Sequence, residues 1–178
     1  MKIYKGGMYM FFIKVFVLLL IFLACLKVGK IIAKKYSNRV TELKEMKNAL
    51  NMFLTKIKFT YESVPESFTE IGNNIAEPIG KIFRISAENM KEKSAGEAWE
   101  EAVEKIETSL SQEDKSIIKG LGRMLGKTDL DGQISEIKLI QNFLNTQIEL
   151  AEKEKQKNEK LYKTLGGVVG LAIVIILV

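Results

Sequence analysis

The sequence AEKEKQKNEKLYKTLGGVVGLAIVIILV, residues 151–178, decides the fold, because it passes within one predicted helix from charged to wholly apolar residues. Residues 152–161 are almost all Lys, Glu, Gln and Asn, whereas residues 165–178 carry no charged or strongly polar side chain. This change indicates a helix that leaves water and enters lipid. Counted from residue 161, the helix is about 27 Å long, close to the roughly 30 Å hydrocarbon core of a bilayer. We therefore predict a membrane helix over residues 161–178; a buried core helix is the alternative.

A second apolar stretch, MYMFFIKVFVLLLIFLACL, occupies residues 8–26 and is interrupted by one lysine. As a helix it is about 28 Å long, which also suits a bilayer. We predict a membrane helix within residues 1–28. Two alternatives stay open: a cleaved signal peptide with Lys2 and Lys5 as its basic head, and a lipoprotein signal cut before Cys25.

Basic residues flank both apolar stretches on the side of the central region. They are Lys27, Lys30, Lys34, Lys35 and Arg39 after the first stretch, and Lys153, Lys155, Lys157, Lys160 and Lys163 before the second. Because basic flanks mark the cytoplasmic side, we expect residues 29–160 to form a cytoplasmic domain of an integral cell membrane protein. Both ends would then lie outside, a placement that Lys2 and Lys5 oppose weakly.

The composition excludes several classes of function. The chain has 27 Lys and Arg against 22 Asp and Glu, and the central region is nearly balanced, so nucleic acid is not an expected partner. There is no His and one Cys, which excludes His-based catalysis, the usual zinc sites and an internal disulfide. The carboxylates of Glu100, Glu101 and Glu104 are interpreted as a solvated helix face. We expect neither an enzyme nor a cofactor or metal site.

Apolar residues recur at three- and four-residue steps through the central region, as in amphipathic helices. The first membrane helix is expected to continue to about residue 61, and short helices follow, including one to residue 110 and one to residue 125. Capping boxes start three of them: Ser63 with Glu66, Ser94 with Glu97, and Ser111 with Asp114. Strand alternation is missing from residues 52–150. We predict an all-α antiparallel helical bundle of about six helices, whose first and last long helices continue into membrane helices at both chain ends.

The last long helix is expected to pair antiparallel with the first through one apolar face. That face consists of Ile134, Ile137, Ile140, Leu144, Ile148 and Ala151. The apolar residues stop well before the last membrane stretch begins. The charged turns between them are therefore expected to form a stalk whose lysines lie near anionic lipid.

The segment LGKTDLDGQ, residues 125–133, is the most distinctive polar stretch. Gly126 is expected to stop a helix, and Thr128 or Asp129 to cap the next one. The segment lacks the spacing of a phosphate-binding loop and the oxygen donors of a calcium loop. The segment supplies four candidate partner contacts: Leu125, Gly126, Asp129 and Gln133. A fifth candidate is the single tryptophan, Trp99, for which core packing is the favoured role.

Gly166 and Gly170 are candidates for a close helix contact. They lie four residues apart in the last apolar stretch, and such a pair of small residues lets two helix backbones approach in lipid. The alternative is lipid-facing flexibility near the headgroups.

Several segments resemble the stage III sporulation protein AB family of spore-forming bacteria. Besides the N-terminal apolar helix, they are FTYESVPESFTEI at 59–71, AWE at 98–100, the loop at 125–133, and the ending from Asn158 through Gly166. The resemblance covers nearly the whole chain. It implies an integral protein of the mother-cell membrane facing the forespore, within the secretion-like complex that joins the two compartments. It also implies a cytoplasmic helical domain similar to type II secretion F platform proteins, a secretion-type ATPase as partner, and no catalytic residues.

The function expected from these observations is a membrane platform or scaffold subunit. Its partners would be membrane lipid, other membrane subunits of the sporulation channel complex and the ATPase, and self-association is also open. The alternative function is a membrane-active, pore-forming or holin-like protein. A pore would require a polar stripe along the first helix, and Lys14 alone does not form one.

Overall fold

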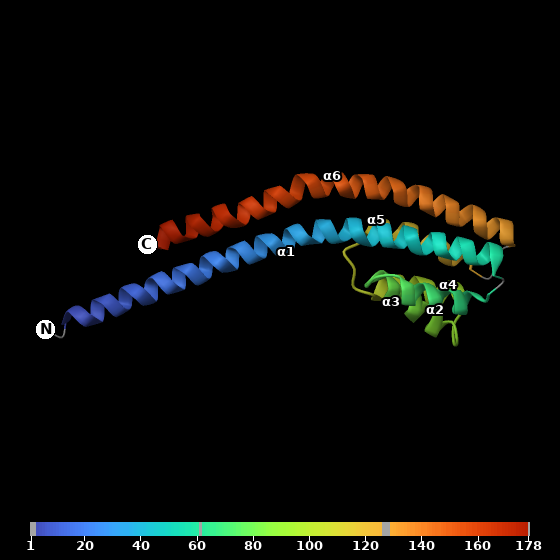
Figure 1. The fold of residues 1–178 in the computed structure, drawn as a ribbon, viewed down its shortest axis with the longest axis horizontal. Helices are drawn as coiled ribbons and strands as arrows, with labels where there is room; N and C mark the ends of the chain where they lie inside the picture. Colours follow the sequence, from blue (N-terminus) through green and yellow to red (C-terminus); the bar gives the residue numbers. More distant parts are fainter. Residues whose placement is uncertain (1–2, 61, 126–128, 178) are drawn as a thin grey trace. The chain divides into compact units, whose positions relative to one another are not determined.

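The computed structural model describes residues 3–60, 62–125 and 129–177, with the backbone alone for residues 3–11. These residues are all-α, as predicted (Figure 1). Six α-helices and one 3₁₀ helix follow in chain order: α1 (Ile3–Phe59), α2 (Val64–Asn74), α3 (Ile79–Asn89), α4 (Ala95–Lys105), α5 (Gln112–Lys119), η1 (Gly120–Arg123) and α6 (Leu130–Leu177).

The chain forms two compact units. The two-helix unit consists of Met1–Ser37 with Lys153–Val178, and the bundle unit is Asn38–Glu152. α1 and α6 contribute to both units, because each is one continuous helix. The predicted domain boundaries at residues 28 and 161 mark where the membrane helices are expected to end. They are a different division from these two units and stay a prediction.

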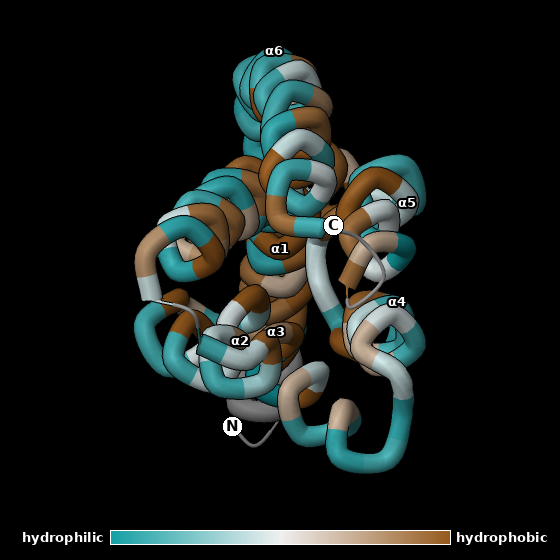
Figure 2. Tube along the Cα trace, turned by 90° about the vertical axis from the view of Figure 1, so that its right-hand side faces the viewer, coloured by the Kyte–Doolittle hydropathy of each residue, from teal (hydrophilic) through white to brown (hydrophobic). Residues whose placement is uncertain are grey.

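Four aromatic rings form the centre of the bundle unit. Phe68 meets the rings of Phe53, Phe83 and Trp99 edge-on, with centroids 5.0, 5.0 and 5.4 Å away. The indole N–H of Trp99 donates to the carbonyl oxygen of Ile118 at 2.9 Å. Hydrophobic and hydrophilic residues follow one another within the turns of α4 and α5, as expected of helices that cover a core on one side (Figure 2).

The three predicted capping boxes are confirmed at the starts of α2, α4 and α5. The helix ends differ from the prediction. α4 ends at Lys105 rather than residue 110, because the following chain is extended and the Glu42 carboxylate accepts the Ser109 N–H at 2.6 Å. α5 ends at Lys119 and passes into η1 instead of continuing to residue 125. At the end of α4, a contact between residues far apart in the chain thus overrides the local helical pattern.

Within the bundle unit, α1 and α6 run antiparallel, as predicted. Lys44 forms a salt bridge with Glu152 at 2.6 Å, and Gln141 donates to Asn51 at 2.8 Å, so positions rise along one helix as they fall along the other. The predicted face of α6 packs inward: Ile137, Ile140, Leu144 and Ala151 are buried, and Ile134 and Ile148 are half-buried.

α1 and α6 are both long and apolar enough to cross a membrane. Only 11% and 6% of their most apolar windows are buried within the described chain. A core helix of a water-soluble fold would be largely covered by its own protein. The low burial therefore favours association with a membrane.

Candidate partner-contact surfaces

Two glycines meet where α1 and α6 pack together in the two-helix unit. A Cβ atom on Gly166 would lie 2.9 Å from the Cys25 carbonyl oxygen and 3.2 Å from the Gly29 Cα atom. A Cβ atom on Gly29 would lie 2.6 Å from the Tyr162 carbonyl oxygen. Real Cβ atoms do not approach this closely, so only glycine allows these backbones to touch.

Gly170 lies one turn further along the same face of α6. A Cβ atom there would lie 2.8 Å from the Phe22 ring and 3.2 Å from the Cys25 Cβ atom. Gly166 and Gly170 therefore lie against α1, and their part in helix association stays a prediction. Gly29 was missed in the sequence, although its spacing from Cys25 is also a pair of small residues four apart.

An apolar groove runs beside this glycine contact, which we call the glycine groove. Its volume is about 310 Å³. The lining includes Ala24, Val28 and Ile32 from α1 and Leu165 and Val169 from α6. This side of the two-helix unit therefore presents aliphatic side chains.

Trp99 and Leu125 lie in the core of the bundle unit. Trp99 has no exposed surface, and Leu125 is 4% exposed. The favoured core role of Trp99 agrees with its position, and neither side chain is available as a surface anchor. Both are therefore core residues of the bundle unit, and a part for either in partner contacts stays an untested prediction.

The polar segment before α6 acts locally as a helix cap. The Asp129 carboxylate accepts the Gly132 N–H at 3.2 Å, and its carbonyl oxygen accepts the Gln133 N–H at 3.0 Å. Asp129 is exposed and Gln133 half-buried, while Gly126 and Thr128 lie outside the described residues. Across the described chain, no group of three His, Cys, Asp or Glu residues could hold a metal ion. Asp129 and Gln133 stay candidate partner contacts.

A buried polar cluster joins three helices of the bundle unit. Arg39 of α1 donates to both carboxylate oxygens of Asp114 at 2.7 and 3.0 Å, and to the Gln147 side chain of α6 at 3.1 Å. Burial alone would raise the pKa of Asp114, but hydrogen bonds from Arg39 and Ser111 lower it below the usual value. A paired, ionised Asp114 thus fixes the start of α5 between α1 and α6.

Glu42 is the second carboxylate buried in this region. Burial raises its pKa, and the backbone N–H groups of Ser109 and Leu110 oppose the rise. The carboxylate holds the connection between α4 and α5. Its role is therefore structural.

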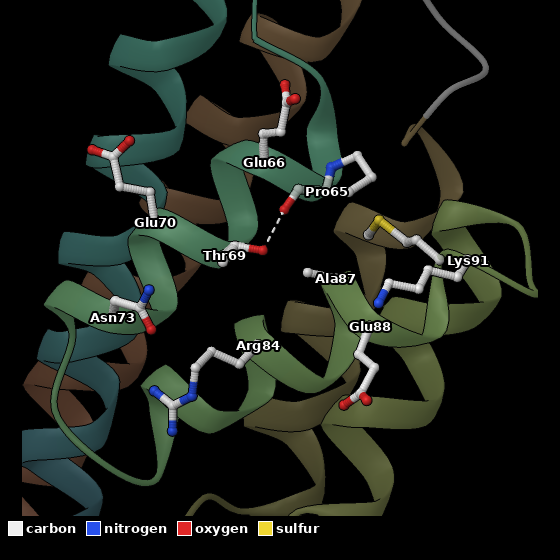
Figure 3. A pocket seen from close by; sticks show the side chains of 10 residues that line it. Pro65, Glu66, Thr69, Glu70, Asn73, Arg84, Ala87, Glu88 and Lys91 are labelled. Atoms are coloured by element: carbon white, nitrogen blue, oxygen red, sulfur yellow. Dashed lines mark hydrogen bonds between the residues drawn. The ribbon is translucent and has the colours of Figure 1, made fainter.

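A groove of about 820 Å³ is lined by residues of α2 and α3. Glu66, Glu70 and Thr69 project from α2, and Arg84 and Glu88 from α3 (Figure 3). Several of these groups are already used: Glu70 pairs with Lys56 at 2.6 Å, Glu66 caps α2, and Arg84 bonds Glu77 and the Gly72 carbonyl oxygen. The groove is thus a mixed-charge surface suited to polar contacts.

α6 also carries an exposed apolar stripe in the bundle unit. Leu139, Phe143 and Leu150 are 45%, 49% and 44% exposed. Their spacing of four and seven residues places them on one side of the helix. The spacing of these three residues can be seen in the sequence, but the more regular apolar spacing of the core face lies in the same helix and was identified instead. The stripe is a candidate protein contact, since exposed large apolar groups in one row favour association.

Comparison with known proteins gives one consistent result. Residues 14–178 match the family model for stage III sporulation protein AB. The stage III sporulation protein AB of Bacillus subtilis (strain 168) is 28% identical over 149 residues, covering 82% of this chain and 87% of that protein. A solved structure of a stage III sporulation protein AB superposes with a TM-score of 0.64 at 22% identity, covering 67% of this chain and 98% of the other.

Proposed function

The chain belongs to the stage III sporulation protein AB family, and we propose that it is a membrane platform subunit of the secretion-like complex linking mother cell and forespore. In this proposal residues 1–28 and 161–178 span the mother-cell membrane. Residues 29–160 form a cytoplasmic helical domain that docks a secretion-type ATPase.

The observation that carries the proposal is the antiparallel pairing of α1 with α6 in both units. In the two-helix unit the pairing is made by apolar stretches and glycines, and in the bundle unit by polar pairs such as Lys44 with Glu152. An antiparallel pair of membrane helices brings the chain back to the side from which it entered the bilayer. A domain between them is therefore attached to one membrane face at both ends, as a platform requires.

The buried titratable groups of the bundle unit also fit a scaffold. Asp114 and Glu42 each hold a helix end or a connection. Groups committed to such bonds are not available for proton transfer to a substrate. The bundle is therefore proposed to act through its surface.

Topology is the first test. Single cysteines would be introduced by Lys5→Cys, Asp131→Cys and Ile176→Cys in a Cys25→Ser background, in growing cells that produce the protein. We expect a membrane-impermeant thiol reagent to label positions 5 and 176 in intact cells, and position 131 only after permeabilisation. Labelling of position 131 in intact cells would place the bundle outside and exclude ATPase docking.

ATPase docking is tested at the exposed stripe of α6. Phe143→Ser removes the largest exposed apolar group of the stripe, and Asn142→Ser is the matched control on the neighbouring exposed position. Co-purification with the co-produced ATPase should fall several-fold for the first variant and stay unchanged for the second. Equal recovery in both variants would exclude this stripe as the docking surface, and failure of the wild-type chain to recover the ATPase would reject docking itself.

A further inference from the structure

The two-helix unit carries a row of lysines on each helix, just beyond the apolar stretches. Together they form what we call the lysine face: Lys27, Lys30 and Lys34 on α1, and Lys153, Lys157 and Lys160 on α6. Steps of three and four residues place each row on one side of its helix. All six side chains are exposed, and none forms a salt bridge with a carboxylate among the described residues.

The glycine contact fixes the direction in which these rows face. Gly29 and Gly166 face the partner helix, and Val28 and Leu165 line the glycine groove on one side. At 3.6 residues per turn, the lysines lie roughly a quarter to a half turn away from the groove-lining residues. Because the helices are antiparallel, the same sense of rotation carries both rows to the side opposite the groove. The unit thus has one aliphatic side and one lysine side.

The charge of the lysine face is not neutralised within the unit. The acidic residues of segments 27–37 and 153–163 are Glu154 and Glu159. Glu159 pairs with Lys163 at 2.6 Å, outside the lysine face. The lysines of the face outnumber these two carboxylates, so the face keeps a net positive charge that can attract an external anion.

We propose that the lysine face binds the headgroups of anionic phospholipids. This rests on the proposed function, because it requires the apolar stretches to lie in a membrane. Lys27 directly follows the apolar residues 8–26, so its row begins at the membrane boundary. Lysine stems extend along apolar surface and place the ammonium group among headgroups, where anionic lipid attracts it. This position favours lipid over an acidic protein.

The register of the helices ranks the six lysines. Gly29 is level with Gly166. At about 1.5 Å per residue, Lys34 and Lys160 lie roughly 8 to 9 Å beyond that level, and Lys153 roughly 20 Å. Attraction to the membrane surface falls off within a Debye length of about 8 Å. The α1 row should therefore contribute more than Lys153 and Lys157.

The test uses the full-length chain in phosphatidylcholine vesicles containing a minor fraction of phosphatidylglycerol. After gentle detergent extraction, mass spectrometry gives the ratio of the two lipids retained by the protein. We expect the wild-type chain to enrich phosphatidylglycerol, and Lys27→Gln/Lys30→Gln/Lys34→Gln to lose most of that enrichment. The control Lys58→Gln/Lys81→Gln/Lys91→Gln removes the same charge from exposed positions of the bundle unit and should retain it.

Each other outcome overturns the proposal. Unchanged enrichment in the α1 variant rejects the lysine face, and equal loss in the control means that only net charge matters. A larger effect of Lys153→Gln/Lys157→Gln contradicts the ranking by depth. Whether the protein floats with the vesicles after an alkaline wash distinguishes the two proposals. If the wild-type protein does not float with them, the membrane proposal itself fails. If it floats but retains the two lipids without selection, only the lysine face is rejected.

Discussion

The bundle unit and the two-helix unit hold their helices together with opposite kinds of residue. In the bundle unit, large aromatic rings around Phe68 are fully buried. In the two-helix unit, Gly29 and Gly166 bring two backbones into contact. Burial from water drives the first arrangement. In the lipid that we propose for the second unit that force is lacking, and close backbone approach supplies dispersion contacts instead. The two units should therefore respond oppositely to changes in side-chain size.

The largest loss of free energy is expected from removing a ring in the bundle unit. Phe68→Ala deletes the ring that touches Phe53, Phe83 and Trp99. Lost burial and the cavity should lower the free energy of unfolding by about 3–5 kcal/mol. Trp99 is the single tryptophan and is buried, so its fluorescence reports urea unfolding of this unit.

Phe68→Leu is the matched control, because it keeps most of the apolar volume and should cost clearly less. If Phe68→Ala unfolds at the wild-type urea concentration, the aromatic cluster does not stabilise the bundle unit. The proposed contrast would then fail for the bundle unit, because burial of large rings would not be what holds that unit together.

Adding a side chain should have the next largest effect, in the two-helix unit. Gly170→Cys brings its Cβ atom near that of Cys25, 3.2 Å away for a Cβ atom built on the glycine and just below the usual disulfide range of about 3.5–4.5 Å. Oxidation of the two thiols by copper phenanthroline should then form an intramolecular disulfide. Adding Gly166→Leu should reduce its yield several-fold, because the leucine meets the backbone of α1. Mass spectrometry of the intact protein measures the yield.

The control for this register is Ala172→Cys, an exposed position two residues further along α6. It should form little disulfide with Cys25. A high yield from position 172, or a yield from position 170 that Gly166→Leu leaves unchanged, would contradict the glycine contact.

A smaller and pH-dependent effect is expected at the polar cluster of the bundle unit. Asp114→Asn removes the charge that Arg39 binds, and should cost about 1–3 kcal/mol at neutral pH. Because the folded-state pKa of Asp114 is lowered, its stabilisation is complete above the ordinary Asp pKa of about 3.9 and is lost as pH falls through the folded value. The difference between wild type and variant should therefore shrink below about pH 4. Urea unfolding followed by Trp99 fluorescence measures it.

Glu113→Gln is the control, since Glu113 is the exposed neighbour in the same turn of α5. It should leave the free energy of unfolding nearly unchanged. A constant difference between wild type and Asp114→Asn from neutral to acid pH would show that the ion pair does not stabilise the fold.

Local patterns in the sequence predict much of this fold. Ser63, Ser94 and Ser111 predict three helix starts, because a capping box lies within four residues of chain. The spacing of apolar residues along α6 predicts its core face, because this pattern too lies within one continuous segment of chain. Gly166 was identified by its own spacing, but its counterpart Gly29 appears only when two distant segments are placed side by side.

The polar cluster could not be predicted, because its members lie far apart in the chain. Arg39 is 75 residues from Asp114 and 108 from Gln147. In the sequence Asp114 has a complete local role in its capping box, which gives no sign of a second partner. The early end of α4 has a similar cause, since Glu42 holds Ser109 from 67 residues away. The partners of this chain also depend on which side chains are exposed together at its surface, and that arrangement follows from the tertiary packing.

The smallest effect is expected at an exposed ion pair of the bundle unit, which tests whether surface charge matters beside the core. Hydrogen bonds from Lys105 and Lys93 lower the pKa of Glu101 to about 2. Because the folded pKa is lowered, the stabilisation is complete above the ordinary Glu pKa of about 4.3 and is lost as pH falls towards 2. An NMR titration should place the Glu101 midpoint below the ordinary Glu pKa, and Lys105→Gln should raise it. Glu101→Gln should nevertheless leave the urea midpoint almost unchanged at neutral pH, because exposed pairs contribute little in water. A loss approaching that of Phe68→Ala would mean that surface charge, rather than the aromatic core, holds the bundle unit together.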